Sequence, residues 1–183
     1  MQDDRLNAIG AMWLAVTPQP VPGPGELLVR MAATGICGSD RHMFRGEYPT
    51  ALPVTLGHEV CGIVEARGEG AGRIPIGAKI TGDPNIACGH CPACRMGRPN
   101  LCHNLTAIGV FRDGGFADHV IAPVEKLFAI PDGMSAYKAS FTEPVAIGVQ
   151  ACRRGAVTAD DSVLIIGAGP IGLALVEVAN ARG

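Results

Sequence analysis

The sequence has no excess of positive charge and no long hydrophobic run. Its 183 residues include 15 basic and 17 acidic side chains, giving a net charge of −2. This balance argues against nucleic acid or an anionic membrane surface as the main partner. No stretch approaches the roughly 18 consecutive apolar residues of a membrane span. The first ten residues lack the basic-then-apolar layout of a signal peptide, so we expect a cytoplasmic protein.

The sequence also lacks the even cysteine count of a disulfide framework. It contains seven cysteines, and an odd number in a chain without a signal peptide speaks against disulfides. Four of them fall in one short segment, from residue 88 to residue 102. Such clustering in a reducing compartment indicates a metal site. Cys61 lies in an apolar run and Cys152 in a helix-like connector, and buried packing is the expected role of both.

Enough apolar material is present for a core, and its pattern changes along the chain. Hydrophobic residues make up 48% of the sequence and charged residues 17%. Before about residue 135, short apolar runs alternate with turns rich in glycine and proline, which is typical of an antiparallel β-barrel or sandwich. Residues 135–155 have a partly helical pattern, and residues 161–183 read as a strand, a glycine turn and an amphipathic helix. The sequence therefore predicts a mainly β domain over residues 1–149 and the opening of an α/β domain over residues 150–183.

The clustered cysteines have the spacing C-x2-C-x2-C-x7-C, formed by Cys88, Cys91, Cys94 and Cys102. Zinc prefers four tetrahedral ligands, and two-residue gaps let successive thiolates surround one ion. Four protein ligands leave no open position, so we expect a structural zinc ion in a lobe over residues 86–104. An iron–sulfur centre and four unligated thiols are the alternatives. The loop histidines His90 and His103 are expected to be exposed.

A second group of polar residues is spread over three segments. The segment GICGSDRHMF contains Cys37, the segment LGHEV contains His58, and the segment TEPVA contains Glu143. Cysteine, histidine and carboxylate are ligand types of a catalytic zinc ion, which keeps one position open for water or substrate. Spacing alone does not show that the three meet, and each has an ordinary structural interpretation when taken singly.

A glycine motif follows the apolar run VLII near the end of the sequence. Gly167, Gly169 and Gly172 give G-x-G-x-x-G before a helical pattern that begins at Pro170 and Ile171. This arrangement is typical of a dinucleotide site with the pyrophosphate at a helix N-terminus, although another α/β protein could use the same turn. The acidic residue that reads the ribose is expected about 20 residues later, beyond the last residue given.

These motifs together resemble a known family. GICGSD, LGHE, the four cysteines, FRDGGFADHV, EPVA and VLIIGAGPIG occur in the order found in zinc-dependent medium-chain alcohol dehydrogenases. The sequence is most similar to the polyol (sorbitol-type) and threonine dehydrogenase branch, from about Pro22 onward. The resemblance implies a GroES-like antiparallel β-barrel, followed by the first βα unit of a truncated Rossmann domain. The first ten residues do not align with the short strand that usually opens the family.

The resemblance also implies roles for particular residues. Cys37, His58 and Glu143 match the catalytic zinc ligands, with glutamate at the third position as in the polyol branch. Glu59 matches a neighbouring carboxylate that moves on and off the metal. The cysteines of the lobe match the family's structural zinc site. Two zinc ions per full-length chain are therefore expected.

Proton transfer and cofactor binding follow from the same resemblance. Ser39 matches the hydroxyl that takes the substrate's proton, and His42 matches the outer member of that relay. Asp40 matches an acceptor that orients the histidine ligand. The glycine motif implies NAD or NADP as the cofactor.

The function expected from the sequence is hydride transfer from a secondary alcohol or polyol to NAD or NADP, in a protein that forms homo-oligomers at full length. One alternative is a truncated, non-catalytic zinc-binding module without a complete cofactor site. A zinc-free relative of quinone reductases is the other, and both cysteine-containing sets argue against it. We also expect residues 163–179 to lack their family sheet, and so to be mobile or packed in another way.

Overall fold

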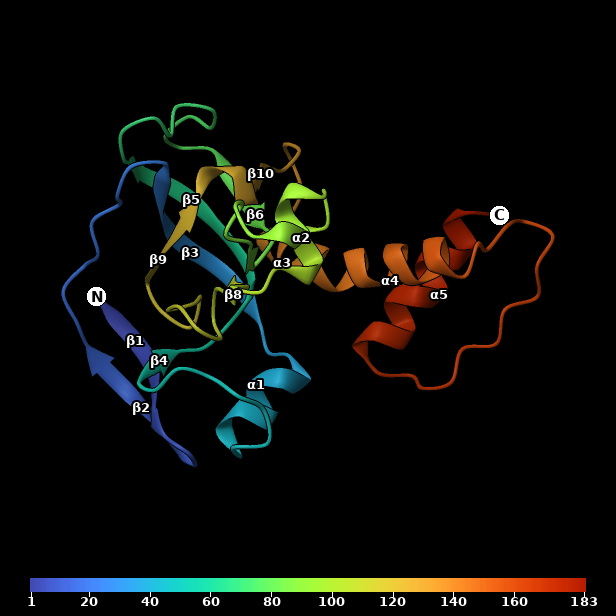
Figure 1. Cartoon of the computed structure of the whole chain (residues 1–183), viewed down its shortest axis with the longest axis horizontal. Helices are drawn as coiled ribbons and strands as arrows, with labels where there is room; N and C mark the ends of the chain where they lie inside the picture. Colours follow the sequence, from blue (N-terminus) through green and yellow to red (C-terminus); the bar gives the residue numbers. More distant parts are fainter. The chain divides into compact units, whose positions relative to one another are not determined.

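The computed structural model describes residues 1–183, which form two compact units, Met1–Ser140 and Phe141–Gly183 (Figure 1). The first unit contains all ten strands, and the second contains two helices. Residue 149, where the sequence pattern predicts the domain boundary, lies inside a helix. The structure divides before that helix, because the helix packs against the last helix of the chain.

The first unit contains three antiparallel sheets. The largest has the strand order β10 (Leu127–Ala129), β6 (Lys79–Gly82), β5 (Glu59–Arg67), β3 (Glu26–Gly35) and β9 (His119–Pro123). A second sheet has the order β2 (Ala11–Val16), β1 (Gln2–Ala8) and β4 (Val54–Thr55), and a two-stranded sheet pairs β7 (Asn85–Ile86) with β8 (Thr106–Ala107). The helices of this unit are α1 (Gly38–Phe44), α2 (Pro92–Arg95) and α3 (Ala136–Ser140), with 3-10 turns at Pro99–Leu101 and Val124–Lys126.

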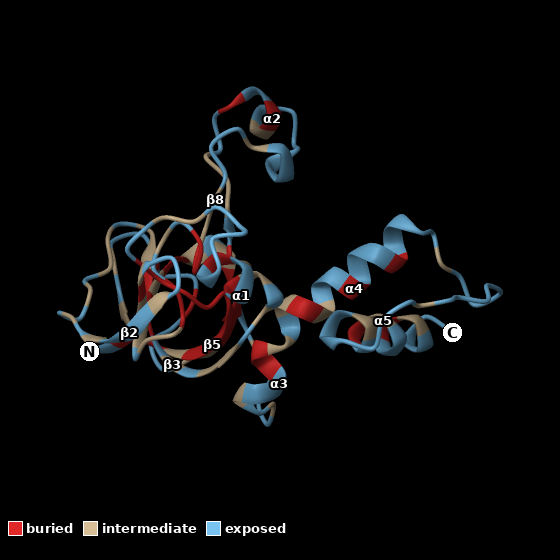
Figure 2. Ribbon diagram, turned by 90° about the horizontal axis from the view of Figure 1, so that it is seen from below, coloured by how far each residue is buried: buried red, intermediate tan, exposed pale blue.

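The main hydrophobic core lies against the five-stranded sheet. Figure 2 shows buried residues concentrated on β3 and β5. Leu27 and Val29 point to this core from β3, and Val64 does so from β5. Residues of this kind favour strands because branched and apolar side chains pack well on a pleated surface. The remaining buried members are Ala71, Ile74, Ile80, Ile108, Val120, Ala122 and Leu127. The antiparallel β architecture predicted from the sequence is confirmed.

The first ten residues, which the sequence motifs leave unassigned, form β1 and the turn into β2. β1 joins the body of the unit through a buried carboxylate. Asp3 is 1% exposed and accepts hydrogen bonds from Thr55 Oγ1 at 2.8 Å, Arg5 Nε at 3.2 Å and Thr17 Oγ1 at 3.3 Å. The other end of the Arg5 guanidinium donates to Asp113 at 2.7 Å. The N-terminal strand is therefore held by a polar network as well as by the packing of Leu6.

The second unit consists of α4 (Thr142–Arg154), α5 (Pro170–Ala181) and the segment between them. The two helices pack against each other and bury Ala174 and Val178, which confirms the predicted helices. The expected strand before the glycine motif is not formed, because no strand of the chain pairs with residues 163–166. Leu164 and Ile166 are consequently 85% and 93% exposed. No helix of the chain combines the length and the apolar character that crossing a membrane requires.

Candidate functional site

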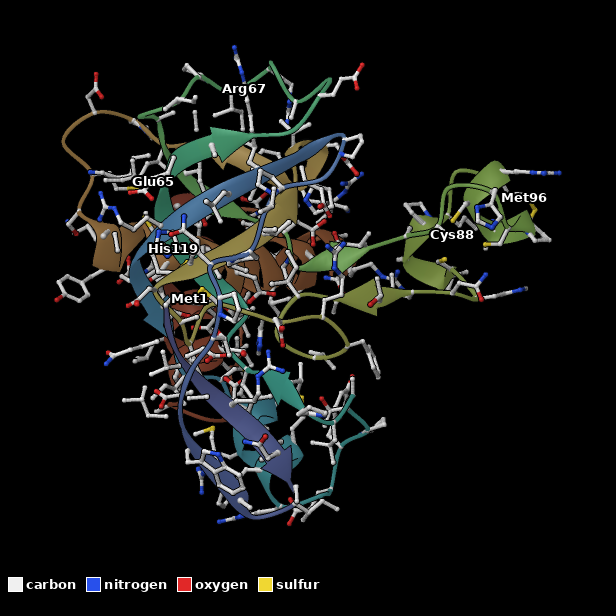
Figure 3. All side chains as sticks on the ribbon, turned by 90° about the vertical axis from the view of Figure 1, so that its left-hand side faces the viewer. Met1, Glu65, Arg67, Cys88, Met96 and His119 are labelled. Atoms are coloured by element: carbon white, nitrogen blue, oxygen red, sulfur yellow. The ribbon has the colours of Figure 1, made fainter.

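The four clustered cysteines lie in a lobe that β7 and β8 carry away from the sheets, as the labelled Cys88 and Met96 show in Figure 3. Their sulfur atoms all lie within 4.8 Å of one another. The Cys91 sulfur is 3.5 Å from that of Cys94 and 3.9 Å from that of Cys102. Four sulfurs at this separation surround a single point, and a tetrahedral ion with metal–sulfur distances of about 2.3 Å fits there.

Backbone N–H groups favour thiolates in this lobe. The N–H groups of Cys94 and His103 lower the pKa of the Cys91 thiol to about 6, and a neighbouring backbone N–H group lowers the pKa of Cys88. Burial and the nearby Cys91 raise the pKa of Cys94 to about 12. Four thiolates therefore do not coexist here without a cation, and the donor set suits a soft divalent ion such as zinc.

His90 and His103 are exposed, as expected for loop histidines. The Nδ1 atom of His90 lies 2.7 Å from the carbonyl oxygen of Cys88. His90 thus closes the turn between the first two cysteines, and the ligand set consists of thiols alone.

A second cluster joins Cys37, His58 and Glu59, whose ligand atoms lie within 4.8 Å of one another. Cys37 immediately precedes α1, His58 follows β4, and Glu59 begins β5. His58 and Glu59 are each 8% exposed. One thiol, one imidazole and one carboxylate form a donor set for a divalent metal such as zinc. The structure thus brings together residues whose spacing in the sequence does not require them to meet.

Asp40 supports this cluster with both of its carboxylate oxygens. One oxygen accepts the backbone N–H of Cys37 at 2.7 Å, which fixes the start of α1. The other faces Nδ1 of His58 at 3.5 Å, and these two buried atoms have no other hydrogen-bond partner. The arrangement directs Nε2 of His58 toward Cys37 and Ser39, because Nδ1 is turned to Asp40. A metal-ligating imidazole needs an acceptor in this place.

The charge of Asp40 also changes the proton affinity of the ring. Burial lowers the pKa of His58, but the hydrogen bond and charge of Asp40, with a smaller contribution from Cys37, outweigh it. The pKa rises from 6.5 to about 9. The metal-free imidazole therefore carries a proton at neutral pH, and a cation that binds Nε2 displaces that proton.

The backbone turn before His58 is held by three glycines in close contact. Gly57 has φ +93°, and the carbonyl oxygen of Gly57 lies against Gly109 and Gly114. A Cβ atom on either of those residues would lie within 2.4 Å of this oxygen. Gly115 donates its N–H to the same carbonyl at 2.8 Å. The loop formed by Asp113, Gly114 and Gly115 therefore shapes the backbone next to a candidate ligand.

Gly35 opens the motif GICGSD, but the sequence does not indicate its role beside Glu59. It pairs with Glu59 across β3 and β5, and a Cβ atom built on Gly35 would lie 1.8 Å from Oε2 of Glu59. The carboxylate therefore reaches the cluster by lying over the bare glycine backbone. This role depends on the pairing of Gly35 with Glu59 across the two strands, and that register cannot be read from a single sequence.

We expect Gly35→Ala to move the Glu59 carboxylate out of the cluster while the sheet stays folded, because the clashing atom is the end of a flexible side chain. Zinc affinity at this cluster should fall roughly tenfold, in the range seen for changes around metal ligands. Isothermal titration of the metal-free chain with zinc measures the change. Gly23→Ala is the matched control, since its Cβ atom would likewise meet a glutamate oxygen, that of Glu26, which belongs to neither cluster. An unchanged second binding constant in Gly35→Ala would show that Glu59 is not a ligand.

The residues expected to relay a proton lie on α1. Ser39 Oγ is 3.4 Å from Nε2 of His58, so the hydroxyl adjoins the cluster. His42 lies one turn later, on the same face of the helix as Ser39. It is exposed, and its Nδ1 atom lies 2.6 Å from Oε2 of Glu47. Ser39 is therefore beside the candidate metal site, and His42 is exposed one turn further along α1.

Glu143 and the glycine motif belong to the second unit. Glu143 lies in the first turn of α4, and its part in the metal site remains a prediction. Gly167 has φ +112°, and Gly169 is the N-cap residue of α5, whose first residues are Pro170 and Ile171. A Cβ atom on Gly172 would lie 1.9 Å from the carbonyl oxygen of Gly167. The turn is therefore as tight as the dinucleotide interpretation requires.

Comparison with known proteins places this site in a family. The family description "Alcohol dehydrogenase GroES-like domain" matches residues 23–132. The chain is 41% identical over 160 residues to the starvation-sensing protein RspB of Escherichia coli K12, covering 87% of this chain and 47% of RspB. It is 39% identical over 167 residues to the sorbitol dehydrogenase of Halalkalibacterium halodurans, covering 91% of this chain and 49% of that enzyme.

The fold agrees with a solved structure over the whole chain. A zinc-binding dehydrogenase candidate from Sinorhizobium meliloti 1021, bound to NADP, matches with a TM-score of 0.97 and 46% identity. The match covers 100% of this chain and 53% of that structure. The chain therefore spans about half the length of the relatives it matches.

Proposed function

The chain belongs to the zinc-binding medium-chain alcohol dehydrogenases, and from this premise we propose that it carries the zinc-binding part of an enzyme that oxidises a secondary alcohol or polyol with NAD or NADP. The observation that carries the proposal is the cluster of Cys37, His58 and Glu59, with Asp40 behind the imidazole. Its thiol, imidazole and carboxylate match a catalytic rather than a structural zinc site, because fewer than four fixed protein ligands leave a position for substrate.

The residues that would hold the metals fall into two sets. Cys37, His58 and Glu143 would hold a catalytic zinc ion, with Glu59 as the neighbouring carboxylate that moves on and off the metal. The thiols of the lobe would hold a structural one. A catalytic zinc ion lowers the pKa of a bound hydroxyl, which favours the alkoxide form of an alcohol near neutral pH.

The protein's own groups would then handle the proton. Ser39 would accept it from the alcohol, since its hydroxyl lies beside the cluster. His42 would take the proton from Ser39 and release it to solvent. Asp40 would keep the His58 ring in the orientation that presents Nε2.

The glycine turn of the second unit would receive the cofactor. Gly169 would let the pyrophosphate approach the backbone, and the free N–H groups at the start of α5 would bind it. Glycine turns of this kind serve NAD and NADP alike. A nicotinamide cofactor is supported by the similar solved structure that contains NADP.

Metal analysis tests the proposed sites. We expect two zinc ions per chain in the wild type and one in Cys37→Ser, because serine is a poor zinc ligand and the lobe is untouched. Inductively coupled plasma mass spectrometry of purified protein measures the stoichiometry. Cys152→Ser, a buried cysteine of α4 outside both clusters, should retain two. One zinc ion in the wild type, still present in Cys37→Ser, would refute the catalytic site.

A non-catalytic zinc-binding module is the second candidate function. It is favoured by the exposure of Leu164 and Ile166, which no strand of the chain covers. Titration of the zinc-loaded chain with NADH, followed by the fluorescence of the nicotinamide, separates the two. Saturable binding supports the dehydrogenase, and a linear response supports the module.

A further inference from the structure

The proposed proton path ends at His42, and the structure gives this histidine one side-chain partner. Nδ1 of His42 lies 2.6 Å from Oε2 of Glu47. The backbone reinforces the contact, since the N–H of Glu47 donates to the carbonyl oxygen of His42 at 2.8 Å. The ring nitrogen Nε2 makes no hydrogen bond within the chain. One nitrogen is therefore engaged by a carboxylate, and the other is available.

The turn that places Glu47 beside His42 is built for close packing. Gly46 has φ +73°, and its N–H closes the turn on the carbonyl oxygen of Met43 at 3.0 Å. A Cβ atom on Gly46 would lie 2.7 Å from the Ile9 side chain. Gly10 donates its N–H to the carbonyl oxygen of Phe44 at 2.7 Å. The β1–β2 turn thus braces the end of α1 and holds Glu47 in reach.

We propose that Glu47 is a positioning residue that fixes the tautomer of His42, so that Nδ1 carries the proton and Nε2 presents its lone pair. In a neutral imidazole, the hydrogen-bond partner of one nitrogen decides which of the two nitrogens carries the proton. A carboxylate accepts but does not donate, so the neutral ring beside it must hold its proton on Nδ1.

This inference rests on the proposed function, since the lone pair matters only if a proton arrives. When the Ser39 hydroxyl passes a proton outward, Nε2 forms the new N–H bond and the ring becomes an imidazolium. The Glu47 carboxylate stabilises that charge without taking the proton, as a buried carboxylate does for a catalytic histidine. Loss of the Nε2 proton to solvent then restores the starting tautomer.

The contact is too exposed to act mainly through stability. The side chains of His42 and Glu47 are 58% and 50% exposed, and ion pairs this exposed to water contribute little to stability. If the pair were merely structural, its loss would leave the ring tautomer unchanged. The tautomer of His42 therefore shows whether Glu47 positions the ring or only packs beside it on the surface.

The test is a long-range 1H–15N correlation spectrum of the chain, recorded above the titration range of the histidine, with neither zinc nor cofactor added. In the wild type, the Nε2 resonance of His42 should have the shift of an unprotonated nitrogen and the Nδ1 resonance that of a protonated one. Glu47→Ala should reverse this order, because an isolated imidazole favours the proton on Nε2. Glu47→Gln keeps an acceptor oxygen and should restore the wild-type order. Glu125→Ala, at an exposed glutamate without an ion pair, is the control.

Wild-type resonances in the reversed order, or no difference between Glu47→Ala and the wild type, would overturn the inference. Alcohol oxidation is measured separately on the zinc-loaded chain with NAD. Glu47→Ala should lower kcat roughly tenfold at pH 7 with KM unchanged, because one proton-transfer group is misplaced. If the wild type oxidises the alcohol but Glu47→Ala does not change the tautomer of His42, the inference is wrong and the proposed function stands. A wild-type chain with the expected tautomer but without oxidation counts against the function alone.

Discussion

Replacement of Cys94 by serine is expected to release zinc from the lobe and unfold residues 86–104 while the sheets remain folded. Structural zinc sites bind with apparent free energies of roughly 10–16 kcal/mol, and this binding energy is also the folding energy of the segment. Few other contacts hold the lobe, since Met96 and Leu101 are 68% and 54% exposed. Without the metal, no shared ion holds the three remaining cysteine side chains together.

Two measurements check this expectation. Metal analysis of Cys94→Ser should show one zinc ion fewer than in the wild type. Hydrogen exchange should show loss of protection confined to residues 86–104. His90→Ala is the matched control within the lobe, because its ring contacts a backbone carbonyl. Full zinc content and unchanged exchange in Cys94→Ser would exclude a four-thiolate site.

Replacement of Asp3 by alanine is expected to destabilise the first unit by about 3 kcal/mol. The carboxylate is fully buried and accepts three side-chain hydrogen bonds, from Arg5, Thr17 and Thr55. Removing it leaves the buried hydroxyl of Thr55 unpaired. It also leaves the Arg5 guanidinium with Asp113 as its remaining carboxylate partner. Losing one partner of such a buried group costs far more than losing an exposed ion pair.

Urea denaturation followed by circular dichroism measures this effect as a shift in midpoint. The neighbouring Asp4 points away from the network and is exposed, so Asp4→Ala should change stability by less than about 0.5 kcal/mol. Equal midpoints for the two variants would mean that the polar network contributes nothing to the attachment of β1.

The sequence predicts the lobe and the second cluster for different reasons. The lobe cysteines lie within one short segment, so their spacing alone implies a shared ion. Cys37 and His58 come from separate elements, and they meet because β3 pairs with β5 and places Gly35 opposite Glu59. A single sequence carries no direct record of that register, and only the family resemblance suggested the pairing in advance. Neither the sequence pattern nor the family resemblance predicts the contact between His42 and Glu47.

The fold shows the same division between local and long-range information. Alternating apolar runs and glycine turns predict the antiparallel β domain, because these signals act over a few residues. The role of the first ten residues depends on Asp3 meeting Thr55, which the local pattern does not encode. The apolar run before Gly167 has strand-like composition, yet it forms no strand, since pairing requires a neighbour that the chain does not supply.

The pairing of β7 with β8 makes the lobe a separable insertion. Asn85 pairs with Ala107 and Ile86 with Thr106, so the two ends of the lobe lie on adjacent strands, about 5 Å apart. A short hairpin turn spans that gap without altering the register of the five-stranded sheet. Gain or loss of the whole lobe during evolution would therefore change the length of the chain and its number of metals, while the geometry around Cys37 and His58 stayed the same.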